Sequence, residues 1–267
     1  MTEPSQRNID GARDAAYRFL VDRGDPFQQL RARCLLGERP PSAVTKQLLE
    51  RGALRAEGPA ALLPALEALD QLDQLDAPEL EPVVAALAGV LGEDGAWGVA
   101  GEALEARIVL TADLAGYLTK TLRLRPRVRD AVDGFLCRTW SPDRVRAGAW
   151  APIAAYAHFF SVNESELSDA ALQWCGRELE RGFRTRRFDA PATARVFLRC
   201  RAVALPGASL TAAELCRALV AEQTEEGGFA LSGRALAGEP GEAALDALAG
   251  LVHLGPAAAA GPAEGDS

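Results

Sequence analysis

Apolar residues recur at three- and four-residue intervals along most of this chain of 267 residues. This spacing gathers apolar side chains on one face of an α-helix, whereas a half-buried strand needs strict alternation, which few stretches show. Helix-forming residues dominate the periodic segments, and glycines and prolines separate them. The pattern therefore predicts an all-α protein.

Twelve segments carry the helical spacing, and they form six consecutive pairs. We expect helices near residues 10–22, 26–37, 42–52, 59–73, 79–91, 105–123, 129–140, 150–162, 168–182, 190–203, 211–223 and 242–254. Pairs that recur at intervals of roughly 35–45 residues are typical of helical-hairpin repeats.

The second helix of several pairs is apolar nearly all round. Residues 107–118, 151–160 and 242–254 carry few charges, while the first helix of a pair is more polar on one side, as in 178–184. A helix without a polar face must be covered on every side. Six covered helices inside six amphipathic ones predict an (α/α)6 toroid, which is a ring of six helical hairpins.

We expect this toroid to form a single domain over residues 9–255. The flanking stretches 1–8 and 256–267 are expected to be disordered, because small and polar residues predominate there.

Composition limits the function classes. The net charge of −8 disfavours a nucleic-acid binder or a protein of anionic membrane surfaces. No apolar run reaches the ~18–20 residues that a membrane-spanning helix needs, and the first ten residues lack the pattern of a signal peptide. The five cysteines are scattered, which is typical of reduced thiols. We therefore expect a cytoplasmic protein with no nucleic-acid partner and no membrane span.

Two loops between paired helices combine acidic residues, glycine and an aromatic residue. They are Glu-Asp-Gly-Ala-Trp-Gly at 93–98 and Gln-Thr-Glu-Glu-Gly-Gly-Phe at 223–229. Glycine permits a tight turn out of the first helix. The aromatic ring is then expected to fill the gap between neighbouring hairpins.

The stretch ALVAEQTEEGGFALSG followed by GEAALDALAGLVHLG resembles the repeat of squalene and terpene cyclases and of protein prenyltransferase β subunits. VLGEDGAWG followed by RIVLTADLAGYL is a second, looser copy. The resemblance implies a toroid whose central apolar cavity binds an isoprenoid or another elongated apolar substrate. It also implies cyclisation or isomerisation in specialised biosynthesis.

The sequence departs from that family at its catalytic motifs. The aspartate-rich motif that protonates the cyclase substrate has its nearest match at 107–112, which keeps Thr111 and Ala112 and contains no aspartate. The Asp-x-Cys motif that holds zinc in the prenyltransferase subunits does not occur. We therefore expect neither a metal nor another cofactor.

Two aspartates are the candidate catalytic residues. Asp113 and Asp246 each interrupt an otherwise apolar second helix, where an unpaired charge is costly. A buried carboxylic acid with a raised pKa is suited to donate a proton. The alternative is that each acid is neutralised by an arginine.

Arginines in the loops and at the start of a second helix are candidates for an anion-binding mouth. The toroid would gather them on one rim with the N-termini of the inner helices, where a diphosphate is favourably bound. The alternative is that they pair with nearby acids such as Asp143 and Asp189. The candidates are Arg107, Arg144, Arg146, Arg184, Arg186 and Arg187.

Aromatic residues of the third and fourth pairs are candidates for binding an apolar substrate, because π-faces stabilise carbocations. The alternative is that these rings fill the seams between hairpins. The candidates are Trp97, Tyr117, Trp150, Tyr156, His158 and Phe159.

These features leave two hypotheses for function. The first is a terpenoid-cyclase-like cyclase or isomerase with a noncanonical acid, acting on a small apolar or diphosphate-bearing ligand. The second is a non-catalytic toroid that carries a small molecule or serves as a partner subunit, with a protein partner or as a homodimer.

Overall fold

The computed structural model describes residues 5–51, 58–99, 101–229 and 240–259. The regular elements among these residues are helices, and the only β-type pairing among them is an isolated bridge between Gln223 and Phe229. The prediction of an all-α protein is confirmed. Residues 1–4 and 260–267, which belong to the predicted disordered ends, lie outside the described residues.

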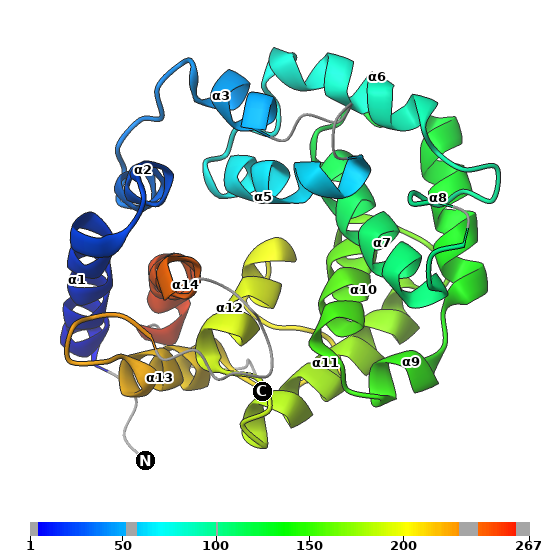
Figure 1. The fold of residues 1–267 in the computed structure, drawn as a ribbon. Helices are drawn as coiled ribbons and strands as arrows, with labels where there is room; N and C mark the ends of the chain where they lie inside the picture. Colours follow the sequence, from blue (N-terminus) through cyan, green and yellow to red (C-terminus); the bar gives the residue numbers. More distant parts are fainter. Residues whose placement is uncertain (1–4, 52–57, 100, 230–239, 260–267) are drawn as a thin grey trace, which may run out of the picture. The chain divides into compact units, whose positions relative to one another are not determined.

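The described residues form thirteen α-helices and two 3-10 helices (Figure 1). The α-helices are α1 (Gln6–Arg23), α2 (Pro26–Leu35), α3 (Val44–Arg51), α5 (Leu63–Gln71), α6 (Glu81–Gly89), α7 (Leu104–Lys120), α8 (Pro126–Thr139), α9 (Pro142–Arg146), α10 (Trp150–Val162), α11 (Ser168–Arg184), α12 (Ala190–Arg199), α13 (Ala212–Glu222) and α14 (Pro240–Ala259). The 3-10 helices are η1 (Pro59–Leu62) and η2 (Pro78–Leu80).

Each of the twelve predicted helices has a counterpart, and the differences lie at their ends. The short helix α9 was not predicted. The helix predicted at 242–254 runs on through Gly255 and Pro256 to Ala259. The predicted helix stops before Gly255, but Leu254 and Ala258 are buried, so packing favours another helical turn.

Contacts divide the chain into two compact units. Unit 1 contains Met1–Arg39 and Leu179–Ser267, and unit 2 contains Pro40–Glu178. The chain passes from unit 2 to unit 1 within α11.

In unit 2, α7 packs against α5, α8 and α10, and α10 makes the largest of these contacts. Residues of α7 from Thr111 to Leu118 are buried without interruption, as are those of α10 from Pro152 to Phe160. The expectation that these two segments are covered on every side is therefore confirmed.

In unit 1, α14 packs against α12 and α13 and also against α1 and α2 (Figure 1). The last helical pair of the chain thus lies directly against the first. Gly255 on α14 illustrates the contact, because a Cβ on it would lie 3.2 Å from the Cγ2 of Ile9 on α1.

The two glycine–aromatic loops have the same backbone hydrogen bonds. The Gly92 amide donates to the Ala96 carbonyl, and the Gly95 amide donates to the Gly92 carbonyl. In the second loop, the Thr224 amide donates to the Gly228 carbonyl, and the Gly227 amide donates to the Thr224 carbonyl. Trp97 and Phe229 therefore occupy equivalent positions, and both rings are buried.

A glycine in each loop lies against the backbone of a neighbouring helix. Gly95 has φ of 86°, and a Cβ on it would lie 2.1 Å from the carbonyl oxygen of Ala131 on α8. Gly227 has φ of 88°, and its Cβ would lie 2.3 Å from the carbonyl oxygen of Ala15 on α1. Gly227 of the second loop thus contacts the backbone of α1 in the same way that Gly95 of the first loop contacts the backbone of α8.

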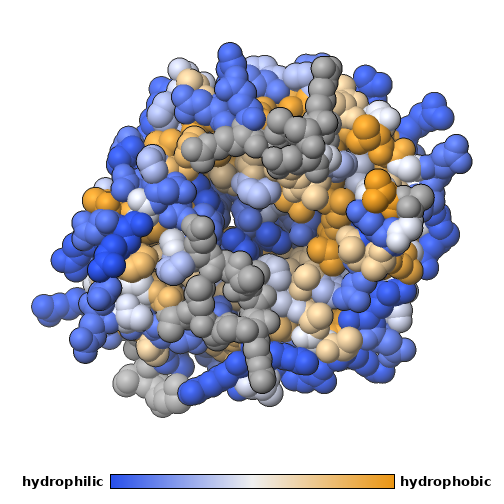
Figure 2. Space-filling model, in the orientation of Figure 1, coloured by the Kyte–Doolittle hydropathy of each residue, from blue (hydrophilic) through white to orange (hydrophobic). Residues whose placement is uncertain are grey.

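None of the described helices combines the length and apolar character needed to cross a membrane. On the face drawn in Figure 2, hydrophilic residues predominate and hydrophobic ones appear in small separate groups. This distribution is expected for the polar faces of amphipathic helices.

We predict that Gly95→Ala and Gly227→Ala each lower the free energy of unfolding by about 2–4 kcal/mol, because the methyl group meets both a left-handed backbone and a carbonyl oxygen. Gly89→Ala is the control, since a Cβ there meets nothing within 4 Å and alanine is the better helix former. Urea unfolding followed by circular dichroism measures all three. A loss at Gly95 without one at Gly227 would show that the two loops are not equivalent.

Candidate functional site

Two predicted site residues, Asp113 and His158, lie side by side in unit 2. Asp113 is on α7 and His158 on α10, and Nδ1 of His158 is 3.6 Å from Oδ1 of Asp113. His158 is completely buried, and Asp113 is 7% exposed. The two helices that cover each other most extensively therefore bring a carboxyl group and an imidazole together away from bulk water.

Gly116 makes room for the imidazole. A Cβ at this position of α7 would lie 2.6 Å from Cε1 and from Nδ1 of His158. Any larger residue would push the ring out of its place. A small residue on α7 thus sets the distance between His158 and Asp113.

Tyr117 and Lys120 continue the polar line along α7. Asp113, Tyr117 and Lys120 are spaced by four and three residues, so they share one helix face, and we call them the α7 polar row. The ring of Tyr117 meets the His158 ring edge-on, with centroids 4.4 Å apart. The ammonium group of Lys120 lies 5.4 Å from the centroid of the Tyr117 ring.

Lys120 ends the row in an ion pair with Asp70 on α5. The two side chains are 4% and 9% exposed, respectively. The other lysine of the chain, Lys46, is 72% exposed and pairs with Glu50 at the surface. The buried lysine is therefore a structural element that joins α5 to α7.

Chemically, the Asp113–His158 pair can hold one transferable proton in an apolar wall. Such a pair is suited to give a proton to a substrate carbon and to take one back.

The second predicted catalytic residue, Asp246, has a different environment in unit 1. Nε of Arg195 on α12 donates to its Oδ1 at 3.2 Å and lies 3.1 Å from its Oδ2. Asp246 is 1% exposed. This is the alternative in which an arginine neutralises a buried acid, and it leaves Asp246 less suited than Asp113 to donate a proton.

Three residues that the sequence analysis did not single out surround this ion pair. Nη1 of Arg31 on α2 donates to both carboxylate oxygens of Glu242 on α14, at 3.0 Å each. Nε2 of Gln28 donates to Oε1 of Glu242 at 3.1 Å, and Nη2 of Arg195 lies 4.0 Å from Oε2. We call Arg31, Gln28, Arg195, Glu242 and Asp246 the arginine–carboxylate cluster.

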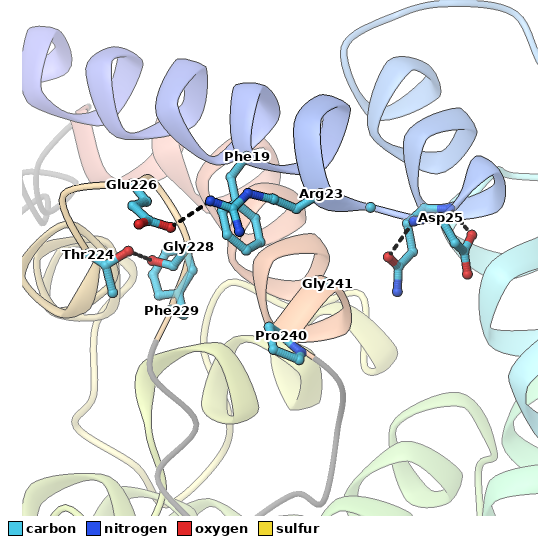
Figure 3. A pocket seen from close by; sticks show the side chains of 11 residues that line it. Phe19, Arg23, Asp25, Thr224, Glu226, Gly228, Phe229, Pro240 and Gly241 are labelled. Atoms are coloured by element: carbon cyan, nitrogen blue, oxygen red, sulfur yellow. Dashed lines mark hydrogen bonds and ion pairs between the residues drawn. The ribbon is translucent and has the colours of Figure 1, made fainter.

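A pocket of about 820 Å³ adjoins this cluster (Figure 3). Gln28 and Gly241 belong to its wall, so the Glu242 carboxylate lies one hydrogen bond behind the pocket surface. The other lining residues are Phe19, Arg23, Gly24, Asp25, Thr224, Glu226, Gly228, Phe229 and Pro240.

The charged groups at the pocket edge are already engaged. Asp25 caps α2, and its Oδ1 accepts the amides of Phe27 at 2.7 Å and Gln28 at 3.0 Å. Nη2 of Arg23 donates to Oε2 of Glu226 at 3.4 Å (Figure 3). The pocket therefore offers two phenylalanine side chains, two carboxylates and one guanidinium group.

The predicted mouth arginines of unit 2 have protein partners. Arg107 pairs with Asp94 at 2.8 Å, and Nε of Arg144 donates to the Thr139 carbonyl. Burial raises the pKa of Asp94, but hydrogen bonds from Arg107 and from the Ala96 amide outweigh it and hold that pKa below its usual value. These contacts fit the alternative in which loop arginines pair within the protein.

Arg146 combines an ion pair with a stacking contact. Its Nη1 lies 3.4 Å from Oδ1 of Asp143, and its guanidinium carbon lies 4.4 Å from the centroid of the Trp174 ring. Arg177 approaches the same ring at 5.6 Å.

The three predicted arginines of unit 1 differ among themselves. Arg184 donates from Nε to Glu180 at 2.7 Å and also meets Glu214. Arg186 and Arg187 are exposed, and Arg186 adopts a left-handed backbone with φ of 55°. The last two are the members of the predicted mouth best placed to meet a ligand from solution.

Most of the predicted aromatic residues are packed in unit 2. Trp97, Tyr156 and Phe159 are at most 1% exposed. The Tyr156 ring stacks on Phe160 at 6.0 Å and meets Trp140 edge-on at 5.0 Å. Burial raises the pKa of Tyr156. Trp150 is half-buried at the start of α10.

The two remaining properties of the site concern metals and thiols. Among the residues that the structure describes, no three histidine, cysteine, aspartate or glutamate side chains are placed to share a metal ion. The five cysteines are free thiols, and burial raises the pKa of Cys216 to about 11.

No protein-family model, curated protein or solved structure matches this chain. The site is therefore interpreted from its own geometry.

We predict that Lys120→Met lowers the free energy of unfolding by about 3–5 kcal/mol, because it leaves the buried carboxylate of Asp70 without its counter-charge. Lys46→Met removes the exposed pair with Glu50 and should change stability by less than about 1 kcal/mol. Chemical denaturation of both variants gives the comparison. Equal effects would mean that burial does not distinguish the two lysines.

Proposed function

We propose that the chain is a closed (α/α)6 toroid. Two observations support the ring. Inner helices that follow one another along the repeat are in contact within each unit, as α5 with α7 and α7 with α10, and as α12 with α14. The last inner helix, α14, also packs against the first pair, α1 and α2, which is the contact that a ring requires and a linear array lacks.

We propose further that the toroid is an isomerase or cyclase that acts by proton transfer on an isoprenoid or another elongated apolar substrate. The single observation that carries this proposal is the Asp113–His158 pair, which lies on two adjoining inner helices that are otherwise apolar. A carboxyl group held in such a wall is the kind of acid that carbon protonation needs.

In this mechanism, Asp113 gives its proton to one carbon of a double bond, which leaves a carbocation on the substrate. The Asp113 carboxylate, aided by His158, then removes a proton from a neighbouring carbon. Atoms balance, so the product is an isomer. Cyclisation follows the same course when a second double bond attacks the cation before the proton is lost. No metal or cofactor enters these steps.

The second candidate function is non-catalytic binding, as a small-molecule carrier or as a partner subunit. The observation that favours it is the pairing of Arg107, Arg146 and Arg184 with acids of the protein itself. Arginines engaged in this way bind a substrate diphosphate less readily than a catalytic mouth would require.

Solvent deuterium distinguishes the two. The protein is incubated in D2O with farnesyl diphosphate, geranylgeranyl diphosphate and squalene in turn, and products are analysed by mass spectrometry. We expect deuterium in a new isomer, and we expect Asp113→Asn to slow its formation about 10²–10⁴-fold. Asp130→Asn, an exposed aspartate of unit 2, is the control and should leave the rate unchanged.

If the wild-type protein leaves all three compounds unchanged, none of them is its substrate. An isomer formed equally well by Asp113→Asn would remove Asp113 from the mechanism. His158→Gln should slow deuterium incorporation while the variant stays folded, since glutamine keeps the polar contact but cannot carry the proton.

The exposed pair Arg186 and Arg187 tests the anion-binding mouth. We predict that changing both to alanine weakens pyrophosphate binding at least tenfold, since each charge-assisted hydrogen bond contributes about 1.5–3 kcal/mol and about 1.4 kcal/mol is a factor of ten. Titration calorimetry measures the binding, and thermal unfolding should show a change of only a few degrees. Equal binding by both proteins would make these ordinary surface arginines.

A further inference from the structure

The arginine–carboxylate cluster has the donor arrangement of a carboxylate-binding site. Arg31 donates to both oxygens of the Glu242 carboxylate and Gln28 donates to one of them. Both donors come from α2, whereas the carboxylate belongs to α14. Donors on one helix that converge on a carboxylate from another are the arrangement used to recognise carboxylate ligands.

The donors are fixed before any carboxylate arrives. The Arg31 side chain is 8% exposed, and Gln28 is 5% exposed. Oε1 of Gln28 accepts the Asp25 amide at 3.0 Å, which orients its amide group. A Cβ on Gly241 would lie 2.2 Å from that same oxygen, so glycine at this position lets Gln28 lie against the start of α14.

The carboxylate in this site is the most exposed part of it. The side chain of Glu242 is 30% exposed, and Glu242 lies in the first turn of α14. A side-chain rotation can therefore move it toward solvent without disturbing the buried donors. Arg195, which lies 4.0 Å away, is held by Asp246 and keeps its place.

The adjoining pocket determines the chemical character of the ligand beyond its carboxylate group. Its wall includes Gln28 next to the carboxylate and the side chains of Phe19 and Phe229 farther along (Figure 3). Its volume of about 820 Å³ accommodates an aliphatic body of moderate length. Its other charged groups, Asp25, Arg23 and Glu226, have protein partners.

We propose that Arg31 and Gln28 form a binding site for the carboxylate of an apolar organic acid, and that the chain's own Glu242 occupies this site until such an acid displaces it. Glu242 is thus an internal mimic that keeps the affinity of the resting protein low. The proposal concerns residues of unit 1 only and does not depend on proton transfer by Asp113.

Octanoate is the probe, with octanol and octylamine as matched neutral and cationic compounds. We expect Glu242→Ala to bind octanoate at least tenfold more tightly than wild type, because the competing carboxylate is gone and Arg31 remains. The affinities for octanol and octylamine should be the same in Glu242→Ala as in the wild type. Titration calorimetry measures the affinities.

Three variants define the site. Asp22→Ala removes an exposed carboxylate of α1 that does not line the pocket, so it controls for a general loss of negative charge and should bind octanoate like wild type. Glu242→Ala combined with Arg31→Met should lose the gained affinity. Glu242→Asp keeps the charge but has a shorter side chain, so its gain in octanoate affinity should be intermediate. It replaces Glu242→Ala as the test if the alanine variant does not fold.

Thermal unfolding gives a second readout. Glu242→Ala leaves the buried guanidinium group of Arg31 without its carboxylate, so its melting temperature should fall, and acetate should restore part of the loss where chloride at equal ionic strength does not. The proposal is wrong if octanoate affinity is unchanged in both Glu242 variants, or if the affinity for octanol rises equally. It is also wrong if Asp22→Ala gains as much affinity, or if the gain survives the loss of Arg31.

Discussion

Burial of helices that turn no polar face to solvent is the constraint on which the rest of this structure depends. An apolar helix in water must be covered on all sides, and α7, α10 and α14 meet this need in the same way. α7 is covered by α5, α8 and α10, while α14 is covered by α1, α2, α12 and α13. In each unit one central helix thus fixes the neighbours around it, and those neighbours bring the functional groups together.

Burying a polar group on such a helix costs free energy. The two units offset this cost with different partners. On α7, Asp113 faces the buried imidazole of His158, with Oδ1 of Asp113 3.6 Å from Nδ1 of His158. On α14, Asp246 and Glu242 face the guanidinium groups of Arg195 and Arg31, so their charges are neutralised in place. Acids on apolar helices therefore meet a histidine in unit 2 and guanidinium groups in unit 1.

The sequence predicted the helices more closely than their contacts. Helical spacing located all twelve predicted segments, because periodicity depends on the local burial of one face. It misplaced the end of α14, because Gly255 and Pro256 signal a stop locally while the buried side chains of Leu254 and Ala258 continue the helix. The shared hydrogen bonds of the two glycine–aromatic loops bear out the expected tight turns and buried rings.

By itself, the sequence determined the all-α class, the positions of the twelve predicted helices and the presence of two acids on apolar helices, since these follow from residue order along the chain. Only the tertiary structure decided which partner each acid meets. His158 is 45 residues from Asp113, and Arg31 is 211 residues from Glu242, so no spacing rule connects them. Such partners are chosen by how helices from distant parts of the chain pack, and packing depends on the shapes of all the residues at the contact rather than on any local pattern.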